Sequence, residues 1–274
     1  MTTGPLDDVL DEVELVRRLR AAGCVFAEDE ARLLLAADPA ELPALLVRRV
    51  AGEPLEVVLG WAEFCGLRVP VDAGVFVPRR RTEFLVACAV GTTSPASVVL
   101  DLCCGSGALG LAVATAVAGV ELHAADVDAA AVACARRAVA PVGGTVHHGD
   151  LFAAMPDVLR GRVDVLLANV PYVPHAAVAL LPPEARLHEP RAALDGGPDG
   201  LDVARRVAAE AGEWLAPGGR LFVEVDQEQA PVAAAVFAAA GLRADVLTAP
   251  EGGATVVRGV SPAAAPRARS PRGR

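Results

Sequence analysis

From residue 97 onward, short apolar runs alternate with stretches of helical apolar spacing, and this alternation constrains the fold more than any other feature. The first unit joins an apolar run at residues 98–102 to a helical pattern at residues 108–117. Parallel strands need a crossover connection, and a helix between successive strands supplies one. We therefore predict an α/β fold with a mostly parallel sheet and helices on both faces.

The same pattern predicts the other elements of this unit. Further strands are expected at residues 121–126, 145–148, 163–168 and 220–225. Helices are expected at residues 129–139, 203–215 and 230–240. The last two strands, at residues 243–247 and 255–259, are joined by a short link and are expected to form an antiparallel C-terminal edge.

The chain before this unit has a different pattern. Helical spacing at residues 6–22, 27–36 and 41–50 predicts a small N-terminal helical domain, residues 1–55. A domain of this size buries little apolar surface by itself, so we expect it to dock on the rest of the chain. Residues 56–91 are expected to form short strands or a hairpin beginning near Val57, then a linker and a helix that Thr82 caps. The main domain spans residues 92–260, and the Pro-, Ala- and Arg-rich tail, residues 261–274, is expected to be disordered.

Charge and cysteine usage narrow the class of protein. The chain has 34 acidic and 25 basic residues, a net charge of −9, so naked nucleic acid is not expected as a partner. No run reaches the length of a membrane span, and the polar start has no secretory pattern. The six cysteines form no CxxC pair and have no histidine at metal spacing, which predicts a reducing cytoplasm and no metal.

The first candidate site comes directly after the strand at residues 98–102. The loop reads Asp101-Leu102-Cys103-Cys104-Gly105-Ser106-Gly107, and its glycines permit a tight turn and close approach of a ligand. With Gly110 they also fit G-x-G-x-x-G, so the loop alone fits either a dinucleotide or S-adenosylmethionine.

The next predicted strand ends at Asp126, whose carboxylate can accept hydrogen bonds from two ribose hydroxyls. A helix-capping aspartate would look the same in sequence, and Asp128 is the alternative candidate for that cap. A ribose-binding Asp126 would fit both cofactors equally well.

The third site favours methyl transfer. The strand at residues 163–168 leads into Asn169-Val170-Pro171-Tyr172. The Asn169 side-chain oxygen and the Val170 carbonyl can accept the two hydrogens of a planar NH₂ group, and the Tyr172 ring can stack on that group. Together they would point the nitrogen at a methyl sulfonium, which is catalysis by orientation.

These motifs, in this order, resemble the class I S-adenosylmethionine-dependent methyltransferases, and more closely the HemK/PrmC family. The resemblance extends from about residue 48 to residue 259. Besides the three sites, it includes Gly52-Glu53-Pro54-Leu55, Val77-Pro78-Arg79, Thr82-Glu83, Gly149-Asp150-Leu151-Phe152, Glu189-Pro190-Arg191, Gly196-Gly197, Asp199-Gly200-Leu201-Asp202 and Pro217-Gly218-Gly219.

The resemblance implies a Rossmann-like methyltransferase fold and transfer of a methyl group to the glutamine of the Gly-Gly-Gln loop in peptide chain release factors. It implies that residues 101–107 hold the methionine part of S-adenosylmethionine, Asp126 the ribose, and Asp150 with Leu151 the adenine; S-adenosylhomocysteine would be the product. Asn169 would face both cofactor and target amide, and the N-terminal helices would recognise the protein substrate.

Three positions depart from the family pattern. Val170 replaces the first proline of Asn-Pro-Pro-Tyr, Cys103 and Cys104 replace Gly and Thr, and Asp226 replaces a glycine. A side chain at position 103 would crowd the methionine moiety unless that residue has a negative φ. Two alternatives therefore stay open: N-methylation of another protein glutamine or an exocyclic base amine, and a cofactor-binding module without activity.

Overall fold

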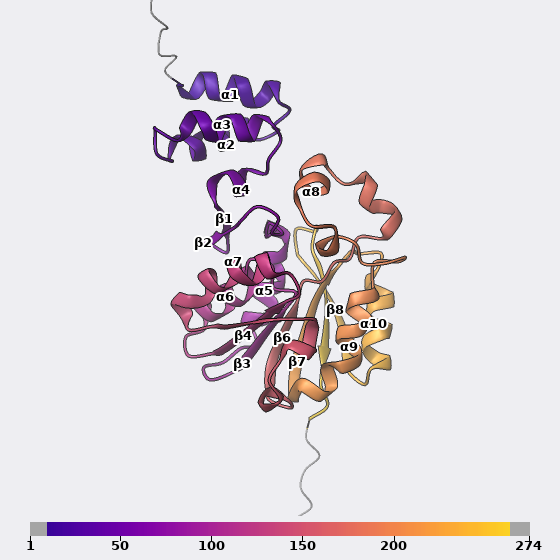
Figure 1. Cartoon of the computed structure of the whole chain (residues 1–274). Helices are drawn as coiled ribbons and strands as arrows, with labels where there is room; N and C mark the ends of the chain where they lie inside the picture. The colour runs from indigo at the N-terminus through magenta and orange to yellow at the C-terminus, as the bar shows by residue number, and fades with distance from the viewer. Residues whose placement is uncertain (1–9, 264–274) are drawn as a thin grey trace, which may run out of the picture.

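The computed structural model describes residues 10–263 (Figure 1). Residues 6–9 of the first predicted helix and residues 264–274 of the predicted disordered tail lie outside the described residues. Figure 1 shows a layered α/β unit, with the N-terminal helices stacked beyond one end of its sheet.

The main sheet has the strand order β5-β4-β3-β6-β7-β9-β8. Its strands are β3 (Val98–Leu102), β4 (Glu121–Asp126), β5 (Thr145–His148), β6 (Val163–Ala168), β7 (Leu215–Val225), β8 (Arg243–Thr248) and β9 (Thr255–Val260). β3 to β7 pair in parallel, whereas β9 pairs antiparallel with both β7 and β8. The predicted mostly parallel sheet and its antiparallel C-terminal edge are confirmed.

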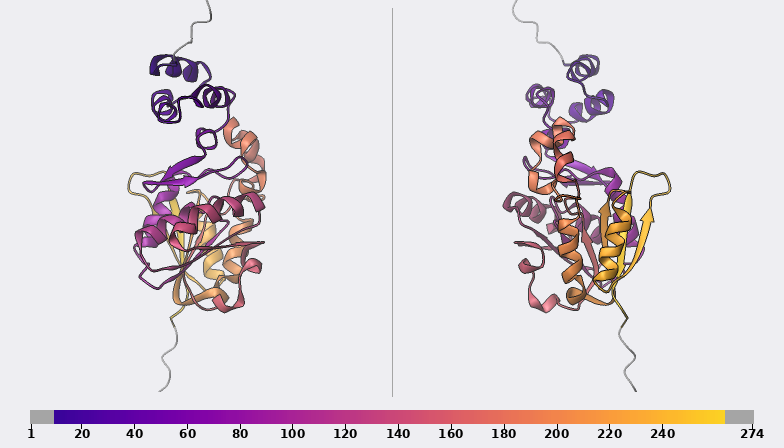
Figure 2. Two further views of the ribbon diagram at one scale, coloured as in Figure 1. Left: turned by 60° about the vertical axis from the view of Figure 1, so that its left-hand side comes forward. Right: turned by 90° about the vertical axis from the view of Figure 1, so that its right-hand side faces the viewer.

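Helices cover both faces of this sheet (Figures 1 and 2). One face carries α5 (Glu83–Val90), α6 (Ala108–Ala116) and α7 (Ala129–Val139); the other carries α9 (Asp202–Trp214) and α10 (Ala230–Ala239). Successive residues of β3 serve different faces, since Val99 belongs to the apolar cluster under α6 and α7 while Leu100 belongs to the cluster under α9 and α10. Burial on both faces explains why this strand is almost continuously apolar.

The N-terminal helices α1 (Glu12–Ala21), α2 (Ala27–Leu35) and α3 (Leu42–Val50) enclose an apolar cluster of their own, which includes Leu15, Leu19, Leu34 and Leu46. The cluster is larger than the sequence led us to expect, because α4 (Leu55–Leu59) adds Leu55 and Val58 to it.

Two predictions about the linker are wrong. Residues near Val57, expected in a strand, form helix α4, because Leu55 and Val58 are buried one turn apart against α1–α3 and Gly60 ends the helix at φ +79°. The hairpin comes next, as β1 (Trp61–Phe64) and β2 (Leu67–Pro70). Thr82 does not cap α5: it lies in a 3₁₀ turn with helical φ and ψ, and its side chain makes no cap hydrogen bond to the helix.

Between β6 and α9 the chain forms a long excursion beyond the carboxyl end of the sheet, beside the N-terminal helices (Figures 1 and 2). It contains α8 (Pro183–His188), and Glu184 of α8 pairs with the buried Arg49 of α3 at 2.6 Å. Short 3₁₀ turns occur at Arg80–Thr82, Ala140–Val142, Leu151–Ala154, Asp157–Leu159, His175–Leu180 and Arg191–Ala193. No helix within residues 10–263 is long and apolar enough to cross a membrane.

Candidate active site

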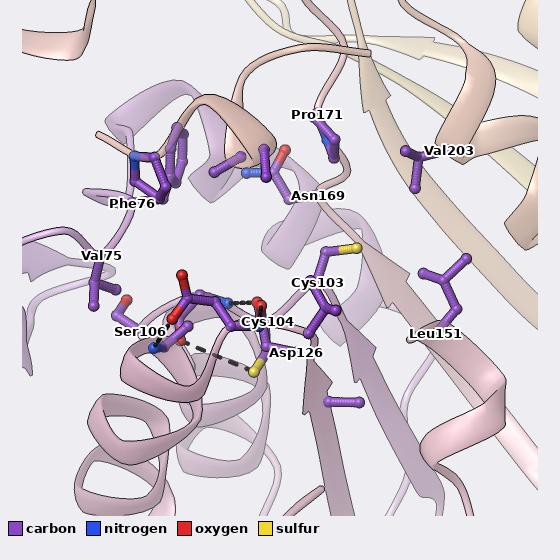
Figure 3. Close-up of a pocket in the computed structure, with 18 of the residues that line it drawn as sticks. Val75, Phe76, Cys103, Cys104, Ser106, Asp126, Leu151, Asn169, Pro171 and Val203 are labelled. Carbon is purple, nitrogen blue, oxygen red and sulfur yellow. Dashed lines mark hydrogen bonds between the residues drawn. The ribbon is translucent and has the colours of Figure 1, made fainter. Parts of the chain in front are cut away.

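The loops after four neighbouring strands, β5, β4, β3 and β6, line one cavity (Figure 3). The strand order reverses at β3, with β4 and β5 on one side and β6 and β7 on the other. Open α/β sheets bind ligands at the carboxyl ends of strands at such a reversal. The predicted site residues in the cavity wall are Cys103, Cys104, Gly105, Ser106, Asp126, Asp150, Leu151, Asn169 and Pro171.

The two glycines of the loop have different functions. Gly107 has φ +79°, and a Cβ atom there would lie 3.2 Å from Ala135 and Val139 of α7, so the loop packs directly on that helix. Gly105 has φ +54°, and the nearest atom to its Cβ position is Phe76 Cβ at 3.9 Å. Gly105 therefore leaves space on the cavity side, where a ligand can approach the main chain.

Asp126 supports this loop from the end of β4. Its carboxylate accepts hydrogen bonds from the Gly105 amide at 2.8 Å and the Asp128 amide at 2.9 Å. Burial raises the pKa of Asp126, and these backbone donors oppose the rise. The helix cap belongs to Asp128, which accepts from the Ala130 and Ala131 amides, so the two aspartates have separate positions and only Asp126 is fixed against the loop.

Asp101 lies behind the loop and not in the cavity wall. Its carboxylate accepts a hydrogen bond from the Gly110 amide at 2.9 Å, and burial raises its pKa to about 7. A Cβ at Gly110 would lie 3.2 Å from that carboxylate and 3.0 Å from Leu122. Asp101 and Gly110 thus hold the start of α6 close to β3.

Cys103 has φ +54°, in the left-handed region, so the negative φ that would turn its side chain away from the cofactor is not observed. Its thiol points into the cavity on the side of Val203 and Leu151 (Figure 3). A left-handed non-glycine residue costs about 1–2 kcal/mol. Burial raises the pKa of both Cys103 and Cys104, so neither is a ready thiolate nucleophile.

Asn169 lies between two cavities. It lines the cavity formed by the strand loops and also a second cavity, to which Val170 and Tyr172 contribute. Its side-chain oxygen is buried and has no hydrogen-bond partner among the described residues. A buried acceptor without a partner costs about 1–3 kcal/mol, so this geometry is typical of an atom that meets its partner in a ligand.

The second cavity is closed by the excursion after β6. Leu181, Pro182 and Glu184 of this excursion line the cavity, so the excursion forms a cover on one side of it. On the other wall, the Arg81 guanidinium lies 5.2 Å from the Tyr172 ring centre and its Nε lies 3.0 Å from the buried carboxylate of Glu224. Arg81 thereby restrains the Tyr172 ring while its own charge is balanced.

Sequence reasoning missed several residues of these walls. Phe76 and Ala193 line both cavities, and Arg206 of α9 lines the first, where it pairs with Asp150 at 2.7 Å. Phe76 comes from the linker next to Val77-Pro78-Arg79, a motif whose position beside the site was the available signal. Within residues 10–263, no three His, Cys, Asp or Glu side chains are grouped so that they could hold a metal ion.

Comparison with known proteins identifies the fold and the family. Residues 67–197 match the model of the methyltransferase small domain. A solved methyltransferase from Pyrococcus furiosus superposes with a TM-score of 0.52 at 14% identity, covering 81% of this chain and 99% of that one, which shows the shared fold.

Similar sequences extend over most of the chain. The release factor glutamine methyltransferase of Geobacter sulfurreducens is 39% identical over 209 residues, which cover 74% of this chain and 72% of that protein. The enzyme of the same name from Cereibacter sphaeroides is 36% identical, with 91% of this chain and 96% of that protein covered. Identity at this level over more than two thirds of each chain shows that this protein belongs to the release factor glutamine methyltransferase family.

Proposed function

We propose that this protein transfers a methyl group from S-adenosylmethionine to the side-chain nitrogen of the glutamine in the Gly-Gly-Gln loop of a peptide chain release factor. One observation carries the proposal: Asn169 lines both cavities, and its side-chain oxygen is a buried acceptor without a partner in residues 10–263. A cofactor on one side and a planar amide on the other would meet there.

Apart from the Cys103 thiol, which points into the first cavity on the side of Val203 and Leu151, the residues of that cavity fit S-adenosylmethionine. Gly105 leaves its main chain open toward the cavity, and Asp126 adds a carboxylate at the end of β4 with acceptor capacity for ribose hydroxyls. Asp150 and Leu151 add a polar and an apolar group beside them, as the adenine requires. When bound, the cofactor supplies a methyl group on a positively charged sulfur.

The second cavity fits the target amide. We assign the Asn169 oxygen and the Val170 carbonyl as acceptors for its two N–H groups, and the Tyr172 ring as the surface on which it stacks. An amide nitrogen is a poor nucleophile because its lone pair is shared with the carbonyl. Acceptors that hold and polarise the N–H groups orient that lone pair, and orientation contributes up to roughly 7–11 kcal/mol.

The names of the relatives support a release factor as the protein substrate. The Arg49–Glu184 pair joins the N-terminal helices to the cover of the second cavity, so we propose that these helices help to recognise that protein. All six cysteines are free, which supports a reducing compartment, and we propose the cytoplasm.

The test is methyl transfer from labelled S-adenosylmethionine to a purified release factor, read by mass spectrometry of the Gly-Gly-Gln peptide. We expect one methyl group on the glutamine nitrogen. A release factor with that glutamine replaced by alanine is the matched control and should take up no label. Cofactor binding without transfer, or a methyl group on another residue, contradicts the proposal.

A further inference from the structure

We infer that Gln229 is a positioning residue that holds the Asn169–Tyr172 segment in its working conformation; this rests on the proposed function and deepens it. Gln229 itself lines neither cavity. Its side-chain nitrogen donates to the Tyr172 carbonyl and to the Asp199 carbonyl, both at 2.8 Å. Its side-chain oxygen accepts from the Asp226 amide at 2.9 Å.

These bonds connect two neighbouring strand ends. Asn169–Tyr172 comes directly after β6, Gln229 lies four residues after β7, and the two strands pair in parallel. Both hydrogens of the Gln229 amide are used, and its oxygen anchors it to its own turn. The Tyr172 carbonyl is therefore tied to the end of the adjacent strand and not only to its own loop.

A glycine turn fills the remaining space around these carbonyls. A Cβ at Gly200 would lie 2.1 Å from the Tyr172 oxygen and 2.3 Å from the Gln229 nitrogen. A Cβ at Gly196 would lie 2.5 Å from the Pro171 oxygen. The main chain at Gly196 and Gly200 thus packs directly against the main chain of the Asn169–Tyr172 segment. The Pro171 and Tyr172 carbonyls therefore have no room to rotate toward these glycines.

This anchoring matters because Val170 lacks the ring that would fix its φ. Within the segment, only Pro171 restricts the backbone by covalent structure. The Gln229 bond restrains the carboxyl end of the segment, and the main-chain direction there sets where the Tyr172 ring and the Val170 carbonyl lie. A displacement of about 1 Å at a reacting group can cost on the order of a hundredfold in rate.

The experiment compares Gln229→Met with Gln227→Met, since Gln227 is an exposed glutamine in the same turn. For Gln229→Met we expect kcat for the release factor to fall roughly 10- to 100-fold. We expect KM for the release factor, and the calorimetric Kd for S-adenosylmethionine, to stay within about threefold of the wild type, because neither cavity wall loses a group. Gln227→Met should match the wild type.

A spectroscopic readout makes the inference independent of the substrate. Tyr172 is the single tyrosine of the chain, so labelling with [1-¹³C]tyrosine yields one carbonyl resonance, from the atom that Gln229 contacts. Loss of the hydrogen bond should move this resonance upfield and broaden it in Gln229→Met and in Gln229→Glu. It should not move in Gln227→Met.

If the Tyr172 carbonyl resonance does not move in Gln229→Met, the inference is wrong. It is also wrong if the fall in kcat is explained entirely by a smaller fraction of folded protein. Should Gln229→Met fail to fold, Gln229→Glu keeps the size of the side chain and serves for the same measurements. If the wild-type protein transfers no methyl group to the release factor, the proposed function fails, while the carbonyl resonance still tests the role of Gln229.

Discussion

Replacing Asn169 by alanine is expected to abolish most turnover without weakening the fold. The Asn169 oxygen is buried with no partner among the described residues, and burying an unsatisfied acceptor costs about 1–3 kcal/mol. Its removal relieves that cost, and the lost contacts of a small side chain offset part of the gain. We therefore expect the free energy of unfolding to rise by about 1 kcal/mol.

The turnover of Asn169→Ala should fall, although its free energy of unfolding rises. Loss of one preorganised hydrogen-bonding group at a reacting centre typically costs about 2.7–4 kcal/mol, which is roughly 10²–10³ in kcat. Asp126 and the Gly105 loop remain in place, so the Kd for S-adenosylmethionine should rise less than about tenfold. Single-turnover transfer, calorimetric titration and urea unfolding measure the three quantities. Turnover within threefold of the wild type, or an activity loss explained by unfolding, refutes the assignment of Asn169.

Three further substitutions test the loop. Asp126→Ala should raise the Kd for S-adenosylmethionine roughly ten- to hundredfold, because the ribose and the Gly105 amide both lose a charged acceptor; unchanged affinity by calorimetry contradicts this. Burial raises the pKa of Asp101 to about 7, above its unfolded value of 3.8, so its contribution to stability is full below about pH 4 and is lost as the pH rises through 7. Asp101→Asn should remove this loss of stability. If the urea midpoint of Asp101→Asn falls between pH 4 and pH 8 as steeply as that of the wild type, the burial argument is wrong. Gly107→Ala should lower the free energy of unfolding by about 2–4 kcal/mol, because it adds backbone strain and overpacks the loop against α7. Gly119→Ala is the control: Gly119 has φ +85° and open space around its Cβ position, so the loss should be only about 1–2 kcal/mol. Equal losses would contradict the packing role of Gly107.

Much of the sheet could be predicted because its strands are buried on both faces. Residues 98–102 and 163–168 are short apolar runs that lead into polar or glycine-rich turns, and both are strands at those residues. The apolar run at residues 57–59 looked the same locally, but it lies in helix α4. Its conformation depends on Leu55 and Val58 packing against α1–α3, which no local pattern contains.

The positions of some site residues could be predicted because these residues lie at the ends of strands. The positions of Asp126 and Asn169 are set directly by strand ends, since parallel strands bring their carboxyl ends to one edge. Phe76 and Gln229 were not predictable in this way. Phe76 reaches the cavities from the linker before the sheet, and Gln229 approaches Tyr172 only because β6 and β7 are neighbours.

The amino-acid sequence by itself determined the alternation of strands and helices, the glycine loop after β3 and the polar segment after β6, because hydrophobic period and turn chemistry are local properties. Only the tertiary structure decided that Asn169 separates two cavities, that Cys103 has a positive φ and points into one of them, and that Gln229 holds Tyr172. These features depend on strand order and on contacts between segments far apart in the chain, and a linear pattern carries neither.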